Sequence, residues 1–201
     1  YFSCNSAPAA IAERKVDPTM YHLFWIPLIA LYSGMRASEI VGLERQDICR
    51  EDGVPCFRVR PNGLRDVKSF CSNRSVPIHP ALLKMGLIDS IDRQEFGPRQ
   101  NIWPSLSKHS GSYGGGFARI WSQYKRKSGI DDVRKTFHSF RHTFIHALAE
   151  VDSQVDVVAE IAGHSMKSEF YGRYRKRPDL RRLLKSVRRV AFPCRMDHLC
   201  A

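Results

Sequence analysis

The sequence predicts a mainly α-helical (α+β) fold, a multihelical domain that contains one small antiparallel β-sheet. Apolar residues recur at intervals of three and four in several segments, which is typical of helices with one buried face. Two short segments, residues 56–59 and 73–78, instead have the composition of paired strands. At 201 residues and 43% hydrophobic composition, the chain is long enough to bury one core.

In the first half of the chain, ordered structure is predicted to start at Asp17. Residues 1–16 are small and polar without a period, and they are expected to be a linker remnant or the start of a first helix. Asp17 can cap a helix and Pro18 can occupy its first position. The apolar segment "TMYHLFWIPLIALYSG" then predicts a buried helix that bends at Pro27 and ends at Gly34. A short helix, "ASEIVGL", follows.

The predicted sheet lies between residues 50 and 78. "REDGVPCFRVR" indicates a turn at Asp52 and Gly53 that leads into a strand over residues 56–59. "NRSVPI" is its expected antiparallel partner, and Pro77 marks a strand end or a sheet edge. The polar loop between the two strands carries Lys68.

The second half of the chain is predicted to be helical apart from one loop. A helix is expected near residues 80–91, and the loop "SKHSGSYGGG" follows it. Two amphipathic helices come next, with apolar stripes formed by Phe117, Ile120, Trp121 and Tyr124, and by Phe140, Phe144, Ala147 and Leu148. "SQVDVVAEIAGH" predicts a further helix, capped by Ser153 and ended by Gly163. "PDLRRLLKSVRRVAF" predicts the last, which buries Leu180, Leu183, Leu184, Val187 and Val190.

The charge balance predicts a polyanionic partner. Lys and Arg outnumber Asp and Glu by 32 to 20, for a net charge of +12. Residues 165–195 carry most of this excess, with Glu169 and Asp179 as their only acids. Such a surface attracts nucleic acid or an acidic membrane face. No apolar run is long enough for a membrane span, so no membrane association is expected. The six cysteines contain no C-x-x-C pair, which favours free thiols over disulfides or a thiolate zinc site.

The segment "FHSFRHTFIHALAE", residues 137–150, allows a phosphate site or a metal site. His138 and Arg141 are three apart and project from the same side of a helix. A zinc hydrolase built on His138, His142 and His146 is the metal alternative, but "HTFIH" lacks the Glu of the H-E-x-x-H pattern. A second arginine, Arg36 in "SGMRASEI", favours phosphate, and Glu39 lies three residues on, where it could orient Arg36.

Taken in order, "SGMRASEIVGL", "VKSFCSNRSVPIHP", "HSFRHTF" and "IAGHSMKSEFYGRY" resemble the catalytic domain of tyrosine recombinases, the phage integrase family. The resemblance covers about residues 20–190. It implies the DNA breaking–rejoining type of fold and a catalytic domain at 17–190, followed by a C-terminal tail at 191–201.

The resemblance also implies a site that cleaves DNA without metal or cofactor. Tyr171 attacks the scissile phosphate and forms a 3′-phosphotyrosyl link. In the implied site, Arg36 and Arg141 hold the nonbridging oxygens of the phosphate. His138 and His164 donate hydrogen bonds to the same phosphate, and His138 also accepts the proton of the tyrosine. Lys68 protonates the leaving 5′-oxygen. Contacts with DNA are expected from Arg74, Lys167, Arg173 and Arg175.

The position of the nucleophile stays open between two tyrosines. Tyr171 is seven residues after His164 and Tyr174 is ten after it, and the usual family spacing falls between them. Tyr171 is preferred because its "YG" sequence matches similar integrases, and Tyr174 is the alternative.

The family analogy extends to partners and location. It implies double-stranded DNA as the partner, a homo-tetramer on DNA with a monomer when free, and a cytoplasmic, nucleoid-associated location in a bacterial or phage-infected cell. A DNA-binding accessory module with a decayed site and a type IB topoisomerase-like enzyme are the alternative functions.

Overall fold

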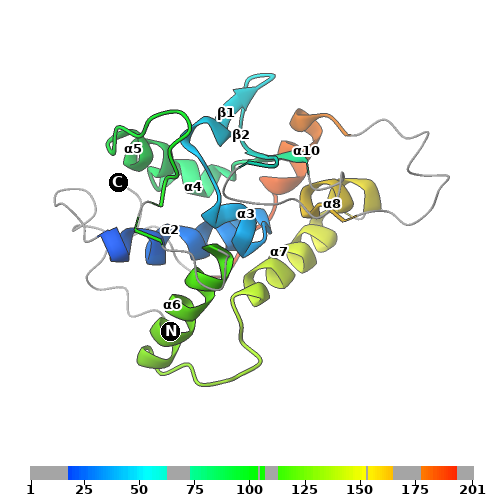
Figure 1. Ribbon diagram of the computed structural model, residues 1–201. Coiled ribbons are helices and arrows are strands. Elements are labelled where there is room, and N and C mark those ends of the chain that lie inside the picture. The colour runs from blue at the N-terminus through cyan, green and yellow to red at the C-terminus, as the bar shows by residue number, and fades with distance from the viewer. Residues whose placement is uncertain are drawn as a thin grey trace.

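The computed structural model describes residues 18–62, 73–103, 105–106, 113–152, 154–164 and 178–193. Within these ranges the helices are α2 (Pro18–Ser33), α3 (Ala37–Val41), α4 (Pro80–Lys84), α5 (Leu87–Asp92), α6 (Tyr113–Lys127), α7 (His138–Val151), α8 (Val155–Ala162) and α10 (Leu180–Val187). The strands are β1 (Ile48–Glu51), β2 (Val54–Val59) and β3 (Arg74–Pro77). The predicted mainly helical fold with a small antiparallel sheet is confirmed (Figure 1).

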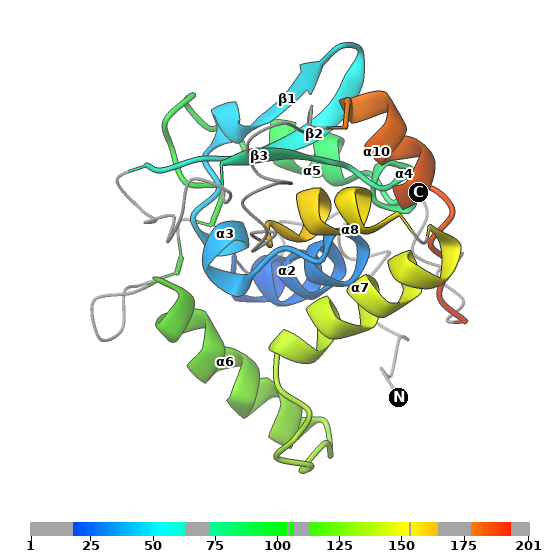
Figure 2. The same ribbon diagram turned by 90° about the vertical axis from the view of Figure 1, so that its right-hand side faces the viewer.

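Helix α2 lies in the middle of the molecule, with the sheet on one side and α6 and α7 on the other (Figure 2). Its Trp25, Ile26 and Ile29 are each no more than 1% exposed. Because the helix is apolar on nearly all sides, it is stable only when other elements surround it. It ends at Ser33, and the next residue, Gly34, has a φ of 64°, which suits the position after a helix C-terminus. The ring of Phe144 on α7 packs directly against this glycine.

The sheet has the strand order β1-β2-β3, with both pairs antiparallel. Asp52 and Gly53 form the tight turn between β1 and β2, and both have positive φ, as a two-residue hairpin of the I′ type requires. The predicted pairing of residues 56–59 with residues 73–78 is confirmed: β2 pairs with β3, and Phe57 lies opposite Val76. Strand β1 was not predicted, because Arg50 and Glu51 give its sequence little strand character.

Two segment boundaries differ from the sequence prediction. The helix expected near residues 80–91 is two short helices, α4 and α5, because Gly86 has a φ of 79° and interrupts the helical backbone. Helix α6 begins at Tyr113, so the last residues of the expected glycine-rich loop are helical. The predicted caps Asp17 and Ser153 lie outside the described residues, and Gln154 is the N-cap of α8.

The amphipathic helices bury the predicted faces. Phe117 of α6 is fully buried in an aromatic cluster with Phe137 and Trp121. Phe144 and Leu148 of α7 are fully buried, and Phe140 and Ala147 pack against the core more peripherally. Helix α10 covers β2 and β3, and it buries Leu180, Leu183, Val187 and the following Val190, with Leu184 partly buried.

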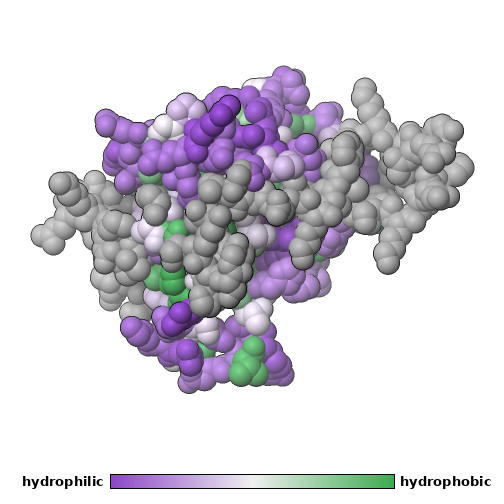
Figure 3. All heavy atoms as spheres, in the orientation of Figure 1, coloured by the Kyte–Doolittle hydropathy of each residue, from purple (hydrophilic) through white to green (hydrophobic). Residues whose placement is uncertain are grey.

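The surface in Figure 3 is largely hydrophilic, with small hydrophobic areas. Val133 and Val155 are the large apolar side chains that stand exposed among the described residues. No helix in the described ranges has the length and apolar character needed to cross a membrane.

Candidate active site

Three arginine side chains from distant parts of the sequence meet at the last turn of α8. Each donates to one of three successive backbone carbonyls: Arg74 Nε to Ile161 at 2.9 Å, Arg141 Nη2 to Ala162 at 2.6 Å, and Arg36 Nη2 to Gly163 at 3.4 Å. The last carbonyls of a helix have no partner within the helix and carry the negative end of its dipole. The arginines therefore fix the C-terminus of α8 and hold His164, the next residue, beside them.

Gly163 is the residue that lets the arginines come this close. Its φ of 65° is left-handed, which ends α8. A Cβ at this position would lie 2.7 to 3.0 Å from the Arg74 guanidinium atoms. The glycine after α8 was predicted as a helix stop, and the structure adds this packing reason.

Glu39 connects two of the arginines. Its carboxylate accepts hydrogen bonds from Arg36 N at 2.8 Å and Arg36 Nη1 at 2.9 Å, and from both Arg74 Nη atoms at 3.0 Å. Burial by itself would raise the pKa of Glu39, but the charges and hydrogen bonds of Arg74 and Arg36 outweigh it and lower the pKa. The predicted contact between Glu39 and Arg36 is thus present in the structure.

Arg74 is enclosed by the protein to the same extent as Arg141, and both are 3% exposed. Its side chain is fully buried and forms an ion pair with Glu39, whose side chain is 5% exposed. The reason is its position on β3, where the side chain points under α8 rather than toward solvent. A contact between Arg74 and DNA stays a prediction from the sequence.

Arg141 is the most buried of the predicted phosphate-binding arginines. Its Nη1 donates to the Gly34 carbonyl at 2.5 Å, so one guanidinium joins the end of α2 to the end of α8. Burial, together with the charge of Arg36, lowers the pKa of Arg141 to about 10. The side chain is still charged at neutral pH.

His138 and His164 stand on the exposed side of these arginines. Arg141 Nη2 is 3.0 Å from His164 Nε2. Because a guanidinium has only donors, this nitrogen must be the acceptor, and the proton of the neutral ring is on Nδ1. Partial burial lowers the pKa of both histidines, and the charges of Arg141 and Arg36 lower both further. Both rings are consequently neutral at pH 7.

The remaining predicted site residues lie outside the described residues. They are the proposed leaving-group acid Lys68, the two candidate nucleophiles Tyr171 and Tyr174, and the basic residues Lys167, Arg173 and Arg175. They stay predictions from the sequence.

The three histidines of α7 do not come together as a metal-binding group. His138 and His142 stack edge to face with ring centroids 4.7 Å apart, and His146 pairs instead with Glu150 at the exposed end of the helix. Within the described ranges, the group of three potential metal ligands that does come together is Cys49, Glu51 and Cys56, on the β1–β2 hairpin.

Two contacts of α10 were not anticipated from the sequence. Arg182 of α10 forms an ion pair with Asp156 of α8 at 3.3 Å, and Ser186 donates to Asp152. The Arg182 pair joins the first turn of α10 to the first turn of α8, and the Ser186 bond joins the last turn of α10 to the residue that ends α7. The basic character of Arg182 suggested an exposed cation and gave no sign of this partner.

The comparison with known families agrees with this geometry. The profile of the phage integrase family matches residues 5–180. The chain belongs to the phage integrase family. Members of this family are site-specific recombinases that act on DNA. No curated protein and no solved structure gave a significant match to the chain.

The electrostatics of this integrase predict an effect of DNA on the two histidines. Without DNA, His138 and His164 should titrate below the ordinary value of about 6.5, since the arginines oppose the imidazolium form. A bound phosphate offsets the arginine charge, so both midpoints should rise when a double-stranded oligonucleotide is added. NMR titration of the imidazole signals measures this. Arg36→Ala without DNA should also raise both midpoints, and a downward or zero shift in either experiment would contradict the assignment.

Proposed function

We propose that this integrase cleaves and rejoins DNA strands through a 3′-phosphotyrosyl intermediate, with Arg36, Arg141, His138 and His164 at the scissile phosphate. The observation that carries the proposal is the convergence of Arg36, Arg141 and His164 at the C-terminus of α8. His138 lies one helical turn before Arg141, close enough to affect the pKa of His164.

The two arginines suit a phosphoryl transition state. Negative charge grows on the nonbridging oxygens as the tyrosine oxygen approaches phosphorus, and planar guanidinium groups can donate to two oxygens at once. Each guanidinium has five N–H donors, so its bonds to the α8 carbonyls leave donors for a phosphate. The positive charges are also held in place before substrate arrives, which limits the reorganisation needed in the reaction.

Proton transfers complete the proposed step. The phenol of Tyr171 gives its proton to neutral His138 as the oxygen–phosphorus bond forms. The bond from phosphorus to the 5′-oxygen breaks, and Lys68 protonates that oxygen. The reverse attack by a new 5′-hydroxyl releases the tyrosine, so rejoining needs no other energy source. In this proposal four protomers on DNA exchange the strands of two duplexes.

Trapping of the covalent intermediate tests the proposal. A nicked suicide duplex that carries the recombination sequence of the element should give a protein–DNA adduct in the presence of EDTA. Tyr171→Phe should abolish the adduct because the nucleophilic oxygen is lost, and the matched Tyr174→Phe variant should retain it. Denaturing electrophoresis of labelled DNA measures both.

Other outcomes separate the alternatives. An adduct that survives Tyr171→Phe but not Tyr174→Phe would move the nucleophile to Tyr174. Salt-sensitive DNA binding without any adduct would indicate an accessory module that has lost its chemistry. Relaxation of supercoiled DNA without any sequence requirement would favour a topoisomerase of type IB.

A further inference from the structure

The β1–β2 hairpin brings two thiols and a carboxylate to one point. Cys49 and Cys56 are directly opposite in the strand register, and their Sγ atoms are 3.6 Å apart. Glu51 lies two residues after Cys49, on the same face of the strand, and its Oε1 is 3.8 Å from Cys49 Sγ. The ligand atoms of all three side chains lie within 4.8 Å of one another.

These separations are close to the edges of a tetrahedral zinc site. Zinc binds thiolate sulfur at about 2.3 Å, so tetrahedral geometry places two such sulfurs about 3.8 Å apart. With carboxylate oxygen at about 2.0–2.2 Å from the metal, the sulfur–oxygen edge is about 3.5 Å. The two sulfurs therefore need to move by only a few tenths of an ångström to share one ion.

The carboxylate is already oriented by two neighbours. Ser75 Oγ on β3 donates to Glu51 Oε2 at 2.7 Å, and Arg58 Nε on β2 donates to Glu51 Oε1 at 2.8 Å. Hydrogen bonds of this kind hold the ligands of metal sites in position. Oε1 receives both Arg58 Nε and Arg58 Nη2, at 2.8 and 2.7 Å, so a metal on Oε1 has to displace one of these two contacts.

The charges at the hairpin also suit a divalent cation. Two thiolates and one carboxylate around a dication leave one net negative charge, and the Arg58 guanidinium, 2.7 Å from Glu51, offsets it. Without this arginine, a partly buried anionic complex would be less stable.

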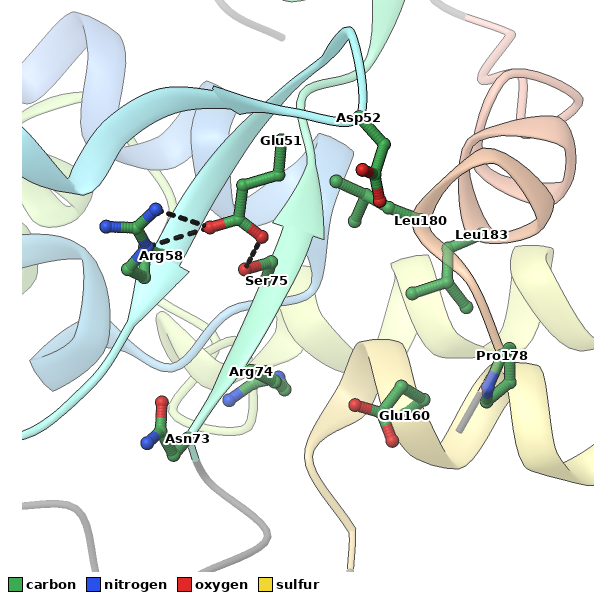
Figure 4. Close-up of a pocket in the computed structure, with 10 residues that line it drawn as sticks. All are labelled: Glu51, Asp52, Arg58, Asn73, Arg74, Ser75, Glu160, Pro178, Leu180 and Leu183. Carbon is green, nitrogen blue, oxygen red and sulfur yellow. Dashed lines mark hydrogen bonds and ion pairs between the residues drawn. The ribbon is translucent and has the colours of Figure 1, made fainter. Parts of the chain in front are cut away.

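One side of the group is open to a ligand from solvent. Glu51, Arg58 and Ser75 line a pocket of about 590 Å³ between the sheet and α10 (Figure 4). Neither cysteine lines this pocket: Cys56 is fully buried, and Cys49 is partly exposed. An ion can therefore enter from the Glu51 side, and a water molecule can take the fourth position.

We propose that Cys49, Cys56 and Glu51 form a structural site for a thiophilic divalent cation of the zinc class. The site braces the β1–β2 hairpin, and it takes no part in the proposed strand cleavage. Burial raises the pKa of both thiols, so binding has to displace their protons, which sets a limit on affinity. The sequence spacing of the two cysteines gives no sign of this site, because only the hairpin register makes them neighbours.

Cobalt(II) is the probe for this proposal, because its absorption spectrum depends on the type and geometry of the ligands that bind it. The full chain is used with Cys4, Cys71, Cys194 and Cys200 changed to serine, fully reduced and free of metal. One equivalent of Co²⁺ should produce a thiolate-to-cobalt absorption band in the near ultraviolet and intense visible bands of tetrahedral geometry. Zinc should bleach both bands by displacement.

Three variants make the test specific. Cys49→Ser should remove the thiolate band, and Glu51→Gln should weaken cobalt binding by about tenfold or more, as loss of a ligand or its orientation does. Asp52→Asn, the neighbouring acid in the turn, should leave binding unchanged, and circular dichroism checks that each variant is folded.

Several results would overturn the proposal. The first is the absence of a thiolate band in the folded, reduced protein, and the second is a band that persists in Cys49→Ser. The third is that oxidised glutathione converts the two cysteines to a disulfide at a rate that zinc does not slow. None of these results would affect the proposed strand cleavage, which is read from the tyrosine adduct.

Discussion

Replacing Arg141 with alanine is expected to lower the rate of strand cleavage by about 10²–10³-fold, the usual effect of removing one donor to a developing oxyanion. The same change should destabilise the fold. It leaves the Gly34 and Ala162 carbonyls without their guanidinium donor, and an unsatisfied buried polar group costs about 1–3 kcal/mol. Single-turnover adduct formation and urea denaturation measure the two effects separately.

Arg36→Ala is the variant that separates these roles. The Arg36 side chain is 36% exposed, and it forms an ion pair with Glu39 at 2.9 Å. We expect a similar loss of cleavage with a much smaller loss of stability. Arg134→Ala, at an arginine whose side chain is 88% exposed, is the matched control and should change neither quantity. Full cleavage activity in folded Arg36→Ala would contradict the proposed phosphate clamp.

Replacing Glu39 with alanine is expected to have the largest effect on stability. The fully buried Arg74 guanidinium would lose its carboxylate partner, and removal of one member of a buried ion pair typically costs about 3–5 kcal/mol. Asp92→Ala breaks the exposed pair with Arg45 and should cost about 0–1 kcal/mol. Equal changes in the free energy of unfolding for the two variants would show that Glu39 and Arg74 are not a buried pair.

A double variant, Glu39→Leu with Arg74→Met, tests whether the pair does more than stabilise the fold. Apolar replacement of a whole buried pair is often neutral or stabilising, so this protein should recover much of the stability lost in Glu39→Ala. Cleavage should stay impaired, because Arg36 loses the carboxylate that orients it and α8 loses one of its three arginine contacts. Recovery of both stability and cleavage would limit the pair to a structural role.

Local patterns were enough to predict most of the helices and their buried faces. The continuous apolar run in α2, the Asp52–Gly53 turn and the stripe of α10 each express the conformational preference of a few neighbouring residues. The predictions missed β1 and the break at Gly86, where polar residues or a glycine leave the local preference weak. Such segments take their structure from pairing and packing with distant parts of the chain.

The site residues also fall into two groups: those that the sequence motifs indicated, and one whose role depends on contacts with distant parts of the chain. The sequence indicated Arg36, Glu39, His138, Arg141 and His164 because four motifs occur together in the order found in the phage integrase family. It did not indicate that Arg74 is buried: the resemblance gave this arginine only as an expected DNA contact. Its burial depends on Glu39, thirty-five residues away in sequence, and on the end of α8, eighty-seven residues away.

By itself, then, the amino-acid sequence determined the helical elements, the basic charge and the set of side chains able to bind a phosphate. Only the tertiary structure decided which cations face solvent and which serve as buried braces. It also decided that Cys49 and Cys56 are neighbours across a hairpin. The physical reason is that burial and charge pairing depend on contacts between residues far apart in the chain, and no local spacing records those contacts.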